Sequence, residues 1–314
     1  MKNKKKRFQT EFAFMAKFAF MAIIALASII AFAGCGGGKT FTDVMEVEDW
    51  LAQQKGGASP EDPIAFSVRL NLQNMASPES NWQKLLTSIN TAGLYIDLDL
   101  SGSTMPGTEF DADGGTKVGK NFIVSLTLPD STASVEGVLY GHFGNLKTAK
   151  ASNIEYLIGN KGPAGGTVFY DKGDTAGGWR YLEAAPAETE FKAEWGAYGQ
   201  NIAGTEAGIG TGKRNTEIIV KYLNLKGKTG RAAQMCRELS VNGFNDWFLP
   251  SSDELGFMYD NLRKNKVGGF SDSFYWSSSQ GYRSHSWYQH FANGSRGNSY
   301  DRDDSYSVRA VRAF

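Results

Sequence analysis

The sequence predicts an α+β protein whose two domains follow an N-terminal export segment. Three observations lead to this prediction. A length of 314 residues suits about two domains. Alternating apolar residues recur along the first half of the chain, and the second half contains a few helical segments followed by short strands. With 41% hydrophobic and 21% charged residues, the composition excludes a disordered chain and a multi-span membrane protein.

Residues 1–34 are predicted to be a lipoprotein signal peptide. The basic opening MKNKKKR is followed by an apolar run from Phe18 to Ala33, which is short for a bilayer-spanning helix but suits a secretory signal. Small residues before Cys35 and a glycine run after it resemble the signal of bacterial lipoproteins. The resemblance implies lipidation of Cys35 and anchoring in the outer or inner membrane of the cell envelope, with exposure at the surface.

Residues 35–158 are predicted to form a leucine-rich-repeat-like spacer domain. Alternation of apolar residues begins at Phe66, at Leu94 and at Phe122, with an equal offset of 28 residues. Such alternation is typical of strands with one buried face. A fourth, degenerate copy is expected over 154–158.

A helix is expected between the first two strands. Four apolar residues follow helical spacing there, behind Ser80 or Asn81 as the cap: Trp82, Leu85, Leu86 and Ile89. A strand and a helix repeated at this period are typical of a leucine-rich-repeat solenoid, and the phrases LDLSGS and LTLPDS resemble leucine-rich surface antigens of oral bacteria. The alternative is a small α+β domain whose strand spacing is accidental.

The second domain is predicted to cover residues 159–314, after turn residues at 159–163. Strands are expected near 165–170 and 179–183, helices at 216–223 and 230–239, and strands at 274–276, 286–291 and 306–314. Another helix is expected to begin at Ser251, because Ser251 and Glu254 form a capping box. Cys236 is expected to be a buried, inert thiol on the packing face of its helix.

Four spaced motifs in this domain resemble one known pattern. They are NDWFLPS at 245–251, DEL at 253–255, YWSSS at 275–279 and VRAVR at 308–312. The pattern is similar to bacterial domains with a C-type lectin fold of the formylglycine-generating-enzyme subclass. Together with the lipoprotein signal, it resembles the treponemal variable lipoproteins of diversity-generating retroelements. The resemblance implies a ligand-binding domain that displays a diversified C-terminal segment to macromolecular ligands.

The composition of residues 282–304 also favours recognition. Tyr, Ser, Asn, Asp, Arg and His crowd together there, as they do in antibody recognition loops. An AAY codon whose first two bases vary can encode these residues but never Trp, so Trp287 is expected to be fixed and to pack beneath the loop. The predicted ligand-binding residues are Tyr282, Arg283, Ser284, His285, Tyr288, His290, Asn298, Ser299, Tyr300, Asp301, Arg302, Asp303 and Asp304. The alternatives are a polar loop that tolerates change, and a non-varying adhesin or cell-envelope structural protein of the same fold.

No catalytic, cofactor or metal site is predicted. Two cysteines and three histidines are too few for a disulfide framework or a zinc site. The oxidase for which the fold subclass is named uses a pair of cysteines near the C-terminal end of its domain, whereas no cysteine follows Cys236 here, so the chain is not expected to be an enzyme. The segments at 208–212, 227–229 and 111–114 each lack a residue that dinucleotide, phosphate or calcium loops require.

Two partners are expected: a macromolecular surface ligand, taken to be a protein, and the membrane reached through the lipid. Residues 35–314 contain 27 Lys and Arg against 32 Asp and Glu, a net charge of −5. This charge does not favour nucleic acid as a partner.

Overall fold

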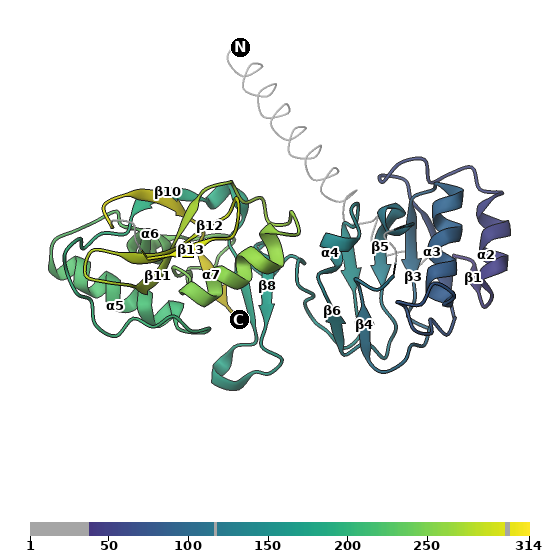
Figure 1. The fold of residues 1–314 in the computed structure, drawn as a ribbon, viewed down its shortest axis with the longest axis horizontal. Coiled ribbons are helices and arrows are strands. Elements are labelled where there is room, and N and C mark those ends of the chain that lie inside the picture. The colour runs from purple at the N-terminus through teal and green to yellow at the C-terminus, as the bar shows by residue number, and fades with distance from the viewer. Residues whose placement is uncertain (1–37, 116–117, 299–301) are drawn as a thin grey trace, which may run out of the picture. The chain divides into compact units, whose positions relative to one another are not determined.

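The computed structural model describes residues 38–115, 118–298 and 302–314 (Figure 1). The predicted signal peptide and Cys35 lie outside the described residues, as do Ser299, Tyr300 and Asp301 of the predicted binding set. No helix among the described residues has both the length and the apolar character that crossing a bilayer requires.

The first part of the described chain is built on a parallel sheet of five strands in the order β1-β2-β3-β5-β7 (Figure 1). The strands are β1 Thr40–Phe41, β2 Ile64–Val68, β3 Ile96–Asp99, β5 Ile123–Thr127 and β7 Thr148–Lys150. Parallel strands need crossover connections, and each crossover here contains a helical segment: α2 Val44–Leu51, α3 Asn81–Ala92, η1 Lys120–Phe122 and α4 Leu139–His142. Two further short strands, β4 Glu109–Asp111 and β6 Ser134–Glu136, pair in a second parallel sheet.

The register of this sheet is less regular than the sequence suggests. Phe66 pairs with Leu98, Leu98 with Leu126, and Leu126 with Ala149. These partners are separated by 32, 28 and 23 residues, so the predicted offset of 28 is confirmed only for the middle pair. The predicted fourth copy at 154–158 is wrong, because the fourth of these strands is β7, whose only apolar residue is Ala149.

Helix α3 forms as predicted. Ser80 is its N-cap, and the Ser80 hydroxyl accepts a hydrogen bond of 3.2 Å from the backbone N–H of Gln83. The helix ends before Gly93, which adopts the left-handed conformation that glycine tolerates best. Its apolar stripe is buried in one core with the inner face of the parallel sheet: Trp82, Leu85, Leu86 and Ile89.

The C-terminal part contains two more sheets, in the orders β10-β14-β11-β12-β13 and β15-β9-β8. Their strands are β8 Thr167–Asp171, β9 Tyr181–Ala184, β10 Phe191–Glu194, β11 Phe274–Gln280, β12 Ser286–His290, β13 Arg296–Gly297, β14 Ser305–Val308 and β15 Val311–Ala313. The helices are α5 Gly212–Leu225, α6 Ala232–Glu238 and α7 Ser252–Met258, with a π-helical turn η4 Tyr259–Arg263 and short turns η2 Ala176–Gly178 and η3 Ala187–Thr189. The chain is therefore a mixed helix and strand protein with several sheets, of which the first is parallel and joined by helical crossovers.

The sequence motifs at the end of this part are structural. In VRAVR, Arg312 is buried and forms ion pairs of 2.9 Å with Glu183 and 2.8 Å with Asp246. Arg309 is also buried and lies 2.6 Å from Glu190. Buried arginines need such partners, because an unpaired charge in the interior is strongly destabilising. These motif residues hold β14 and β15 in place and are not displayed to a ligand.

Candidate ligand-binding face

The predicted binding residues that the structure describes come from neighbouring segments of the C-terminal sheet. Residues 281–285 connect β11 to β12, and residues 298–304 connect β13 to β14. A side chain at Gly281 would approach Asn298 to 2.8 Å, which shows that the two connections lie against each other. The described ends of both loops therefore lie side by side, and the backbone N–H of Arg302 donates to the carbonyl of Ser284 across them. We call these residues, 281–285 with 298 and 302–304, the candidate face.

Most of the predicted residues on the candidate face are accessible. Tyr282 is 72% exposed, although large aromatic side chains are mostly buried in folded proteins. Arg283, Asp303 and Asp304 are exposed as well. Three others are partly exposed: Ser284, His285 and Asn298. The predicted residue His290 does not lie on the candidate face, because it ends β12 at the strand's other end and stacks on Phe274 with ring centres 4.2 Å apart. The candidate face thus offers one aromatic ring, one guanidinium group and two carboxylates to solvent.

Arg302 is a correction to the predicted set, because it is completely buried. Its guanidinium donates to the carbonyl oxygens of Tyr282, at 2.9 Å, and His285, at 3.0 and 3.1 Å. Its backbone N–H donates to the carbonyl of Ser284 at 3.1 Å. Arg302 therefore cannot contact a ligand, and it instead fixes the loop that carries Tyr282 and Arg283.

The same guanidinium also holds a third segment. It donates to the carbonyl oxygens of Ala197, at 3.3 Å, and Gln200, at 2.9 Å, and it lies 4.3 Å from the ring centre of Trp195. Burial lowers the pKa of Arg302 to about 10, which leaves the group protonated at neutral pH. One buried cation thus ties residues 196–200 to residues 281–285.

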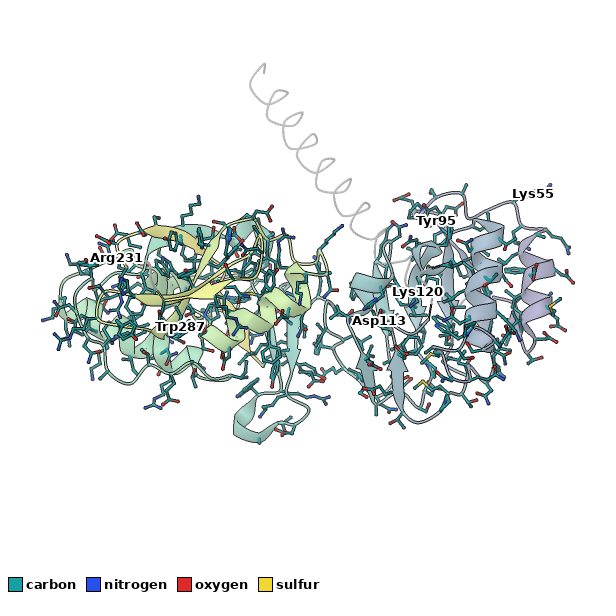
Figure 2. All side chains as sticks on the ribbon, viewed as in Figure 1. Lys55, Tyr95, Asp113, Lys120, Arg231 and Trp287 are labelled. Carbon is teal, nitrogen blue, oxygen red and sulfur yellow. The ribbon has the colours of Figure 1, made fainter. Side chains whose placement is uncertain are left out.

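Tyr288 is the second correction. Successive side chains of β12 point to opposite faces of the sheet, and Tyr288 takes the inner one, opposite Trp276 on β11. It is 9% exposed and packs edge-on against Phe274 with ring centres 5.4 Å apart. Trp287, labelled in Figure 2, takes the other face and is half-buried, so it is less enclosed than Tyr288.

Sequence reasoning missed the segment 196–200. Tyr198 is 52% exposed and Gln200 is exposed, and both belong to the segment that Arg302 holds. The composition of this segment, GAYGQ, combines Tyr with Gly as recognition loops do. This composition can be read from the sequence. Nothing in the sequence shows that the segment 196–200 lies beside residues 281–285.

The two segments that resemble calcium and dinucleotide loops are filled by side chains of the protein. The Lys120 ammonium donates to the carbonyl oxygens of Ala112, at 3.0 Å, and Gly114, at 3.2 Å, within the calcium-like segment DADG. The glycine-rich segment 208–212 instead surrounds the carboxylate of Glu254. Within the part of the chain that the structure describes, no three His, Cys, Asp or Glu side chains come together as a metal site.

Cys236 lies in the core of the C-terminal part, as predicted. Burial raises the pKa of its thiol far above the usual range. A thiol that stays protonated and inaccessible is not a nucleophile.

Comparison with known proteins gives one family match. Residues 187–312 match the model of the Lcl C-terminal domain. The matched region is therefore similar to an Lcl C-terminal domain. It contains the candidate face and the segment 196–200. It also contains Arg302 with the residues that contact it, which we call the Arg302 cluster: Trp195, Ala197, Gln200, Tyr282, Ser284 and His285.

The other comparisons add little. No curated protein matches the chain. A solved structure of a fimbrial protein from Bacteroides ovatus matches with 14% sequence identity and a TM-score of 0.37 over 62% of this chain and 52% of that protein. The chain thus spans about half the length of that protein.

Proposed function

We propose that the protein is a lipid-anchored, surface-displayed binding protein whose candidate face recognises a macromolecular ligand. The observation that carries this proposal is the Arg302 cluster. Accessible Tyr, Arg and Asp side chains lie on loops whose backbone carbonyls are hydrogen-bonded to a buried guanidinium. Holding a binding surface in one conformation before the ligand arrives reduces the entropy lost on binding.

The finer parts of the proposal rest on sequence resemblance. They are a C-type lectin fold of the formylglycine-generating-enzyme subclass for residues 159–314, an anchor at Cys35, and diversification of residues 282–304. The proposed activity is binding without catalysis or cofactor, and residues 35–158 act as a spacer. Cell-envelope anchoring with the C-terminal domain turned outward would make the candidate face available to partners.

A protein is the ligand that the candidate face suits best. Tyr282 offers a large rigid contact and Arg283 a planar donor, and these residue types dominate binding energy in protein interfaces. A face of this size corresponds to an interface of under about 800 Å² per partner. Affinity would then depend on these two residues more than on the remaining contacts.

The alternative is an adhesin of the same fold that does not vary. One observation favours it: Tyr288 and Arg302 fit the codon pattern of variable positions, yet both belong to the interior. If residues that the variable codon pattern can encode are packed in the interior, fewer positions of the segment are free to change. Both readings share the candidate face and differ only in whether its sequence diversifies.

The binding proposal can be tested without knowing the ligand. We expect the unlipidated mature chain to bind at least one protein on an array of extracellular host and bacterial proteins. The variant Tyr282→Ala/Arg283→Ala should lose that binding by about a hundredfold, since it removes the two exposed anchors. Its melting temperature should stay unchanged, because neither side chain is buried.

The control variant is Glu217→Ala/Lys221→Ala/Leu225→Ala. These three residues are exposed on α5, away from the candidate face, so their replacement should leave binding intact. Equal binding by both variants would contradict the proposed function.

A further inference from the structure

A cavity of about 470 Å³ opens beside the segment that Arg302 holds. Its walls come from the end of β10, the segment 196–200, the C-terminal end of α5 and the start of α6, and from one residue of the candidate face. The charged and aromatic residues of the lining are Glu194, Tyr198, Tyr222, Lys226, Lys228, Arg231 and Asp303. Because Asp303 lines the cavity and also lies on the candidate face, the two form one continuous surface.

The cavity carries an excess of positive charge. Arg231, labelled in Figure 2, lies 3.2 Å from Glu194, so these two charges neutralise each other. Lys226 and Lys228 form no ion pair with any carboxylate among the described residues. They face a single further carboxylate, Asp303, and the net charge of the lining is +1. This contrasts with the net charge of −5 on residues 35–314.

Aromatic surface completes the lining. The Tyr222 hydroxyl donates to the side-chain oxygen of Gln200 at 3.2 Å, which fixes the ring against the segment 196–200. The Lys226 ammonium lies 5.7 Å from the centre of the same ring. Tyr198 is half-exposed at the rim. A ligand group with an apolar stem and an anionic end would meet both kinds of surface.

We infer that this cavity binds the carboxylate groups of an acidic segment in the protein ligand. The inference names the ligand chemistry of the proposed binding surface and so rests on the proposed function. A volume of about 470 Å³ is within the range of ligand pockets and accommodates one or two Glu or Asp side chains. Opposite charge would also speed the encounter of the two proteins.

A carboxylate fits this lining better than a phosphate does. Phosphate recognition favours arginines that can donate two parallel hydrogen bonds, and Arg231 already lies against Glu194. A dianion would also meet stronger repulsion from Glu194 and Asp303. The net charge of +1 on the lining matches the single negative charge of a carboxylate.

The inference is tested with fluorescein-labelled hexaglutamate and the unlipidated mature chain, by fluorescence anisotropy. We expect saturable binding that weakens with added salt, and no binding of labelled hexaglutamine. The variant Lys226→Glu/Lys228→Glu should bind hexaglutamate at least about tenfold more weakly. The milder variant Lys226→Gln/Lys228→Gln should show a smaller loss and covers the case in which the charge reversal fails to fold.

The matched control is Lys213→Glu/Lys221→Glu, which makes the same charge change on α5 outside the cavity. It should bind hexaglutamate as the unmodified protein does. Equal losses in the two reversal variants, binding of hexaglutamine, or binding of inorganic phosphate in place of hexaglutamate would each overturn the inference.

The two proposals fail in different ways. Tyr282→Ala/Arg283→Ala should abolish binding of the macromolecular ligand and leave hexaglutamate binding intact. If that variant still binds the macromolecule while the lysine variants lose hexaglutamate, the cavity is a binding site and the candidate face is not. If the lysine variants keep hexaglutamate binding, the cavity inference fails whatever the candidate face does.

Discussion

Arg302 is a buried cation whose hydrogen-bond partners are backbone carbonyls rather than a carboxylate. Taking a charge out of water is costly, and the lowered pKa of this group reflects that cost. Charge-assisted hydrogen bonds to four carbonyl groups and the face of Trp195 offset it. Three of these carbonyls also accept a backbone N–H within their own loop: Tyr282 from His285, His285 from Gly281, and Ala197 from Gln200. Arg302 adds the hydrogen bonds that join the two loops to each other.

Replacing Arg302 by Met should therefore lower the free energy of unfolding by about 3 kcal/mol, because the charge-assisted hydrogen bonds that join the two loops would be lost. Urea denaturation of the full chain measures this change. The control Arg283→Met removes an exposed guanidinium on the same loop system and should change stability by less than about 0.5 kcal/mol. Equal effects of the two substitutions would show that the Arg302 cluster does not hold the loops.

At the scale of elements, the start of α7 is joined to a distant loop through one carboxylate. Glu254 accepts from the backbone N–H of Ser251 in its own capping box, at 2.7 Å. It also accepts from the N–H groups of Gly210, at 2.9 Å, and Gly212, at 3.4 Å. A side chain at Gly212 would approach the Glu254 carboxylate to 2.2 Å, which explains a glycine there. Burial without a cationic partner raises the pKa of Glu254 to about 7.

This pKa predicts how stability changes with pH. Between pH 4.5, the usual pKa, and about 7, the folded state binds the Glu254 proton more tightly than the unfolded chain does. The contribution of this group is therefore complete below pH 4.5 and declines as pH rises to 7, by about 3 kcal/mol. Glu254→Gln cannot titrate there. The difference in unfolding free energy between the natural protein and this variant should decline over the same range, and a constant difference would contradict the account.

Sequence patterns predicted elements wherever the pattern is local. Alternation located β2, β3 and β5, and capping residues located the starts of α3 and α7. The strand β7 was missed because only one of its residues, Ala149, is apolar, so it shows no alternation. Its pairing with β5 makes it a strand. The strand β10 was missed for a similar reason, since it pairs with β14 more than a hundred residues further along.

At the scale of the whole molecule, composition predicted which segment has exposed side chains. It did not predict which side chains of that segment are exposed and which are buried. Tyr282, Arg283, Asp303 and Asp304 are exposed as expected. Arg302 is of the same residue type as Arg283, and its contacts with Trp195 and four backbone carbonyls make it part of the interior. The segment 196–200 and the cavity lysines belong to the site through tertiary structure alone, and no local pattern connects them to residues 282–304.

The most direct test of the central claim is deep sequencing of the coding locus and its flanks from a growing culture. The account predicts a nearby near-copy that differs at adenines, and variation at the codons of exposed residues such as Tyr282, Arg283 and Asp303. The codons of Tyr288 and Arg302 should stay constant, because both side chains serve the interior. An invariant locus without such a copy, or equal variation at Arg302 and Tyr282, would contradict a diversified face held by a fixed cluster.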